Sequence, residues 1–147
     1  MELKDLLNVA LRIESDGYKQ YSKLAEKNTG EMKTLFERLA RQEREHQEKF
    51  KKIFDKCEKE PEKEVNWPMD ENAGYLMEFA EESIFPKLSE DFAPKNINDA
   101  IDMAIGVEKD SIIFYNDLKG FFKNKQTINN VIAEEKKHLM DLLKNRK

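Results

Sequence analysis

The chain has 147 residues, of which 39% are hydrophobic and 38% are charged. One domain of this length can bury a sizeable core. Five glycines and four prolines offer few helix breakers, so we expect long helices with solvated outer faces and almost no β-strand. The net charge is −4 and both signs alternate along the chain, which argues against nucleic acid as a partner.

The sequence offers neither a membrane-spanning segment nor a secretion signal. It contains no long apolar run, and its first residues, MELKDLLNVALRIE, lack the basic start and apolar core of a signal peptide. We therefore expect a cytoplasmic protein that does not contact a membrane. The single cysteine, Cys57, cannot form a disulfide within the chain and excludes a Cys-x-x-Cys metal knuckle.

Apolar residues repeat with helical spacing over the first 60 positions and predict two helices. The first runs from about Leu3 to Lys27 and ends in a polar turn with a glycine. The second runs from about Glu31 to Lys59, and Pro61 ends it. These two helices form a predicted hairpin over residues 1–60.

Residues 61–95 differ in composition, because all four prolines of the chain lie there. The stretch from Gly74 to Phe85 predicts one short amphipathic helix, and we expect Trp67 to seat this segment against the rest of the molecule. The segment is too long for a tight connection between helices. It predicts a crossover that travels the length of a bundle before the next helix starts.

The last part of the chain, residues 96–147, predicts a second hairpin. Asn96, with Asp99 three residues later, is a plausible cap for its first helix, which ends near Gly120. The other helix starts near Thr127. We include Ile97 in the apolar stripe of the first of these helices and Leu143 in that of the second.

The two predicted hairpins resemble each other in sequence. Glu14 recurs 94 positions later as Glu108 (108 minus 14), and Glu43 recurs 92 positions later as Glu135 (135 minus 43), with a histidine three residues after each member of the second pair. Two such hairpins packed about a pseudo-twofold axis bring equivalent positions face to face. The sequence therefore predicts one all-α domain over residues 1–147, a four-helix bundle with a long crossover.

Six ionisable residues interrupt the apolar stripes, and they include both histidines of the chain: Glu14, Glu43, His46, Glu108, Glu135 and His138. Burying an ionised carboxylate costs several kcal/mol unless it is compensated. The arginines fall largely on the outer helix faces, which leaves protonation or metal binding as the compensation. A single Glu-x-x-His is common on charged helices, but here both pairs lie on stripes at the repeat offset.

Metal binding fits the number and type of these residues. Four carboxylates carry four negative charges and two neutral imidazoles add none, so two divalent cations balance the set. Residues three positions apart on a helix are neighbours, so each Glu-x-x-His pair can reach one point in the bundle. Oxygen and nitrogen ligands of this kind suit iron or manganese, with zinc possible. We therefore predict two metal ions at this site.

The chain resembles the rubrerythrin branch of the ferritin-like superfamily in four segments, ALRIESDGYKQYSKLA, RQEREH, AIGVEKDSIIFYNDL and AEEKKH. The resemblance implies a ferritin-like antiparallel bundle around two iron ions. It implies that Glu14 and Glu108 are terminal ligands and that Glu43 and Glu135 bridge the ions. It also implies that His46 and His138 each bind one ion.

The activity implied by the resemblance is reduction of hydrogen peroxide, or dioxygen, as the iron pair cycles between diferrous and diferric forms. Two features depart from the family pattern. The paired Cys-x-x-Cys motifs of a rubredoxin-like domain are absent, so electrons come from an external donor such as a rubredoxin. Ser111 stands where the family has an extra glutamate, and Gly17 is its repeat equivalent. The resemblance associates a movement of iron with that extra glutamate, and this chain has a serine at the position.

Three tyrosines lie one or two helical turns from Glu14 or Glu108: Tyr18, Tyr21 and Tyr115. They either hydrogen-bond the ligands or absorb stray oxidising equivalents, or they are core aromatics whose hydroxyl has a partner. Two other functions remain open for the whole chain. One is ferritin-like oxidation of ferrous iron and iron handling, and the other is a non-enzymatic, metal-stabilised helical module. A homodimer is possible for this architecture.

Overall fold

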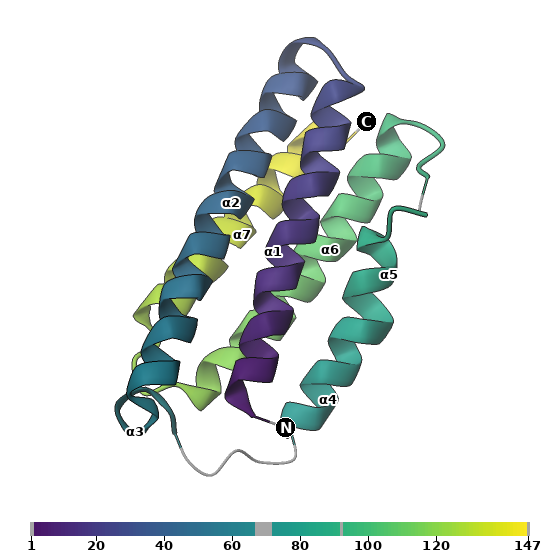
Figure 1. Cartoon of the computed structure of the whole chain (residues 1–147). Coiled ribbons are helices and arrows are strands. Elements are labelled where there is room, and N and C mark those ends of the chain that lie inside the picture. The colour runs from purple at the N-terminus through teal and green to yellow at the C-terminus, as the bar shows by residue number, and fades with distance from the viewer. Residues whose placement is uncertain (1, 67–71, 92, 147) are drawn as a thin grey trace.

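The computed structural model describes residues 2–66, 72–91 and 93–146. Four long helices lie side by side: α1 (Leu3–Glu26), α2 (Gly30–Lys59), α6 (Ile97–Leu118) and α7 (Gln126–Asn145). Figure 1 shows that α1 and α2 run in opposite directions, as do α6 and α7. Within the described ranges the only β-type pairing is an isolated bridge between Val65 and Phe122. The predicted all-α four-helix bundle is confirmed.

The ends of the long helices are close to the predicted positions. Gly30 opens α2 with a φ of +64°, a left-handed conformation that favours glycine at the turn between α1 and α2. At the start of α6 the Asn96 side chain accepts a hydrogen bond of 2.8 Å from the backbone N–H of Asp99. The predicted N-terminal cap is therefore present. A 3₁₀ turn, η2 (Lys119–Phe121), follows α6 and leads toward α7.

The crossover contains α3 (Pro61–Glu64), α4 (Asn72–Phe79), a π-helical turn η1 (Ala80–Ile84) and α5 (Phe85–Leu88). From α4 to α5 it runs along the bundle, as predicted, beside α1 and α6 (Figure 1). Its helix is longer than the expected Gly74–Phe85, because the π turn, in which the Phe85 N–H bonds to the Ala80 carbonyl, lets the chain pass Pro86. Trp67 lies outside the described residues.

Polar contacts attach the crossover to the bundle. The Nζ of Lys87 lies 2.6 Å from Oδ2 of Asp110 on α6, and the Ser83 hydroxyl donates to the same oxygen at 2.6 Å. From α1, the Gln20 amide donates to the Lys87 carbonyl at 3.0 Å. Lys87 also lies against Gly106 of α6, where a Cβ would be 3.4 Å from its Nζ. The crossover is therefore fixed to both hairpins.

The apolar core is divided into two clusters with a polar layer between them. On α1, Ile13 belongs to one cluster and Tyr21 to the other; on α7, Ile132 and Leu142 are divided in the same way. On each helix the predicted ionisable residues fall at or near this division, as Glu14 does on α1. The two apolar clusters therefore enclose the six residues from both ends.

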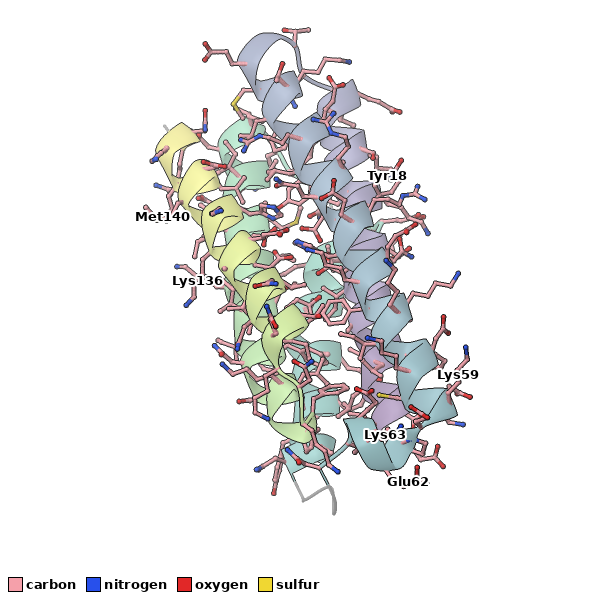
Figure 2. All side chains as sticks on the ribbon, turned by 90° about the vertical axis from the view of Figure 1, so that its left-hand side faces the viewer. Tyr18, Lys59, Glu62, Lys63, Lys136 and Met140 are labelled. Carbon is pink, nitrogen blue, oxygen red and sulfur yellow. The ribbon has the colours of Figure 1, made fainter. Side chains whose placement is uncertain are left out.

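Outer faces carry charge and a few apolar side chains. Figure 2 shows Lys59, Lys63 and Lys136 directed away from the bundle. The assignment of two residues to the core was wrong: Ile97 is 37% exposed and Leu143 is 44% exposed. Ile97 is the first residue of α6, and Leu143 follows the fully buried Leu142, so a step of one helical residue turns it outward. None of the helices described here is long and apolar enough to cross a bilayer.

Candidate metal centre

The structure brings all six sequence-predicted residues together in the middle of the bundle. Glu14 comes from α1 and Glu108 from α6, while α2 and α7 each supply one Glu-x-x-His pair. Each of the six side chains belongs to a residue that is at most 3% exposed. Each reaches the interior because it follows the apolar stripe of its own helix.

Ligand atoms of these residues form two groups, within each of which the atoms lie no more than 4.8 Å apart. One group holds Glu14 and His46, and the other holds Glu108 and His138. Glu43 and Glu135 belong to both groups. Two sites that share two carboxylates have the arrangement of a carboxylate-bridged metal pair.

Both imidazoles direct Nδ1 into the centre and Nε2 away from it. The Nδ1 of His46 lies 2.9 Å from Oε1 of Glu135, and the Nδ1 of His138 lies 3.4 Å from Oε1 of Glu43. Each Nε2–H donates to a partner on the opposite hairpin. The two rings are stacked, with centroids 5.7 Å apart. These outer hydrogen bonds fix the ring orientation and leave the Nδ1 lone pair available to a metal.

The acceptors of these outer bonds were not predicted from the sequence. His46 Nε2 donates to Oε2 of Glu134 at 2.5 Å, and His138 Nε2 donates to Oε1 of Gln42 at 2.5 Å. A signal for them exists, because Gln42 and Glu134 are themselves 92 positions apart (134 minus 42) and each directly precedes a shared glutamate. Polar residues beside a buried glutamate are common on a charged helix, so this signal is weak by itself.

Two of the three candidate tyrosines contact the site, and they do so across the hairpins. Tyr115 on α6 donates a hydrogen bond of 2.7 Å to Oε1 of Glu14 on α1. Tyr21 on α1 donates one of 2.6 Å to Oε1 of Glu108 on α6. Tyr18 is not part of the centre, since its ring packs under the Arg44 guanidinium at 4.1 Å. The tyrosine hydroxyls thus hold one oxygen of each carboxylate and leave the other free.

The unpaired polar atoms test whether these residues fit metal ions. Within the described part of the chain, the buried side-chain atoms that lack a hydrogen-bond partner are Glu14 Oε2, Glu43 Oε1, Glu108 Oε2 and His138 Nδ1. All four belong to the two ligand groups. Buried unsatisfied acceptors are costly, and a cation between them satisfies several at once. The donor set fits a pair of divalent ions.

Without metal, the centre holds protons in their place. Burial lowers the pKa of both imidazoles, but hydrogen bonds and charges from neighbouring carboxylates outweigh it, raising the pKa of His46 to about 11 and that of His138 to about 10. Burial and the charge of Glu135 raise the pKa of Glu108 to about 8. Burial, followed by the charges of Glu135 and Glu14, raises the pKa of Glu43 well above its ordinary value. Metal binding must therefore displace protons.

Gly17 gives the shared Glu43 its space. A Cβ at this position would lie 3.1 Å from Oε2 of Glu43, which is closer than almost all real Cβ contacts. Its repeat equivalent, Ser111, is 2% exposed and sits on the buried face of α6. Neither position supplies an additional carboxylate, so the candidate ligands among the described residues are four glutamates and two histidines.

The fold and the centre define a class: a ferritin-like bundle with a carboxylate- and histidine-lined site for two metals. A solved structure from Thermotoga maritima, provisionally described as a ferritin-like diiron-carboxylate protein, is similar to the chain with 32% sequence identity and a TM-score of 0.70. The match covers 99% of this chain and 95% of that one. The rubrerythrin family model matches residues 5–145, and the chain belongs to the rubrerythrin family. No curated protein sequence is significantly similar to it.

Proposed function

We propose that the chain binds two iron ions and reduces hydrogen peroxide with electrons from a separate donor. The observation that carries this proposal is the pair of ligand groups that share Glu43 and Glu135. These two glutamates would bridge the ions, because each belongs to both groups. A bridging carboxylate keeps two ions close enough to act on one small substrate.

The remaining ligands are divided between the ions. Glu14 and His46 would hold one ion, and Glu108 and His138 would hold the other, because each pair belongs to one group alone. The four carboxylates neutralise two divalent charges, and the imidazoles are already oriented by their outer hydrogen bonds. Oxygen-rich ligands with one imidazole per ion suit iron and manganese better than softer metals.

The proposed substrate is hydrogen peroxide, and membership of the rubrerythrin family supports this choice. When bound, a pair of ferrous ions would supply two electrons that, with two protons from solvent, reduce one peroxide molecule to two water molecules. The chain's own part is to hold the ligands rigidly and to exclude bulk water: the two apolar clusters close the centre at both ends. The tyrosine hydroxyls keep Glu14 and Glu108 in place.

The electrons come from outside these 147 residues. Cys57 is the single cysteine and lies partly buried on α2, where burial raises the pKa of its thiol to about 11. It cannot form the four-thiolate iron site of a rubredoxin. A rubredoxin or a similar one-electron carrier that docks on the bundle is the proposed donor.

Anaerobic loading followed by oxidation tests this function. Metal-free protein is loaded with ferrous iron and mixed with hydrogen peroxide or, separately, with oxygen, and the absorption of the oxidised iron pair is followed in time. We expect faster oxidation by peroxide than by oxygen at a ratio near two iron ions per chain. Rapid oxygen consumption with iron accumulating beyond that ratio would instead assign iron handling. A chain that holds redox-silent zinc in preference to iron would be a metal-stabilised module.

Tyr115→Phe tests the role of the tyrosines. The substitution keeps the ring and removes the hydroxyl that donates to Glu14. Because a hydrogen bond to a charged acceptor contributes about 1.5–3 kcal/mol, we expect the ion at Glu14 to bind at least about tenfold more weakly. Calorimetric titration with manganese measures this affinity. Tyr75→Phe is the matched control, because Tyr75 is 68% exposed. An unchanged affinity in Tyr115→Phe would make this tyrosine a core aromatic only.

A further inference from the structure

The two histidines of the centre differ in their outer hydrogen-bond acceptor. His46 Nε2–H donates to the carboxylate of Glu134, whereas His138 Nε2–H donates to the amide oxygen of Gln42, each at 2.5 Å. Both acceptors lie on the hairpin opposite to the histidine. The distances match, so the difference between the two contacts is one of charge.

The internal repeat places the two outer contacts at equivalent positions. Gln42 and Glu134 occupy equivalent positions of α2 and α7, because each directly precedes a bridging glutamate. The tyrosine contacts are matched as well, at 2.7 Å to Glu14 and 2.6 Å to Glu108. Gly17 and Ser111 do differ, but Gly17 faces Glu43, which belongs to both groups, so its effect falls on both ions.

A carboxylate acceptor raises the basicity of a metal-binding imidazole more than an amide acceptor does. It takes the Nε2–H into a charge-assisted hydrogen bond, which increases the electron density on Nδ1 and the basicity of the ligand. Glu134 is kept in place by Lys49, whose Nζ lies 3.2 Å from its Oε1. The side chain of Glu134 is 31% exposed, so it stays ionised without adding an uncompensated buried charge.

We propose that Glu134 and Gln42 make the two metal sites unequal, so that the ion at His46 and Glu14 binds more tightly than the ion at His138 and Glu108. The inference rests on the proposed two-metal site but not on peroxide reduction. Glu134 is a positioning residue that acts through His46. The pair therefore fills and empties in a fixed order, with the His138 ion exchanging first.

Titration of metal-free protein with cobalt(II) tests this order without any turnover. Absorption of bound cobalt reports stoichiometry, and selective ¹⁵N labelling of the two histidines reports by paramagnetic broadening which ring receives the first equivalent. We expect two steps separated by about tenfold or more in affinity, with the His46 signals lost first. Glu134→Gln assigns the signals, because it changes the contact of His46 alone.

The decisive variant exchanges the two outer acceptors between the sites. Glu134→Gln should weaken the first step about tenfold and bring the two steps together, whereas the double variant Gln42→Glu with Glu134→Gln should reverse the order of filling. Glu45→Gln is the control, since Glu45 is an exposed carboxylate on α2 between two proposed ligands. An order of filling that the exchange leaves unchanged would overturn the proposal. Binding of fewer than two cobalt ions would overturn it together with the two-metal site, while failure to reduce peroxide leaves these readouts unaffected.

Discussion

Replacing Glu43 or Glu135 with alanine is expected to abolish binding of both metal ions. Each of these carboxylates belongs to both ligand groups, so its loss removes a ligand from each ion and leaves the two cations without a bridge between them. Iron content after anaerobic loading and desalting should fall from about two ions per chain to none. Measurement is by elemental analysis against protein concentration.

Two other variants give this experiment its contrast. Glu45→Ala removes an exposed carboxylate from the same helix and should leave the metal content unchanged. Glu14→Ala removes a ligand from one group alone and should weaken one ion more than the other. Retention of one tightly held ion in Glu43→Ala, or equal loss of both ions in Glu14→Ala, would contradict the division into bridging and terminal ligands. Circular dichroism of each metal-free variant separates ligand loss from unfolding.

The metal-free chain is expected to lose stability as the pH rises from about 5 to about 10. Folding raises the pKa of Glu108 from 4.5 to about 8, that of His138 from 6.5 to about 10, and that of His46 from 6.5 to about 11. At a pH between the unfolded and the folded pKa of each group, the folded chain holds a proton that the unfolded chain has released. The free energy of unfolding therefore falls with pH, by at least about 1 kcal/mol per pH unit near pH 7.5.

Metal should reverse this dependence. The ions replace the protons on the same side chains, so metal affinity rises with pH. The increase in the free energy of unfolding that bound metal gives should therefore be largest above pH 7. Urea denaturation at pH 5.5, 7 and 8.5, with a chelator or with excess manganese, measures both slopes. Glu108→Gln removes one of the titrating groups and should flatten the slope of the metal-free form. A metal-free form that becomes more stable over this range would exclude protons as the replacement for metal.

Helical periodicity was sufficient to predict the bundle and the six central residues. Glu14 and Glu108 stood out because an ionisable residue on an apolar stripe needs compensation, and the repeat placed them opposite each other. The division into two hairpins and a crossover as one domain over 1–147 stays a prediction. The same holds for the homodimer.

What periodicity could not predict depends on small rotations and local backbone geometry. Tyr18 and Tyr21 are three positions apart on one helix, yet only Tyr21 turns inward far enough to reach Glu108. The π turn that carries the crossover helix past Pro86 has no hydrophobic signature. Gln42 and Glu134 lie at the edge of the buried face, where a polar residue ordinarily faces water.

The cross-hairpin contacts have a consequence for the chain as a polymer. Tyr115 reaches Glu14 across 101 positions of sequence, and His46 reaches Glu135 across 89. An ion held by both hairpins closes a loop of comparable length, as a disulfide would, and the entropy lost by the unfolded chain grows with the logarithm of that length. Unlike a disulfide, the proposed cross-link would form and open with the concentration of free metal. The supply of metal around the protein would therefore set the fraction of molecules whose two hairpins are cross-linked.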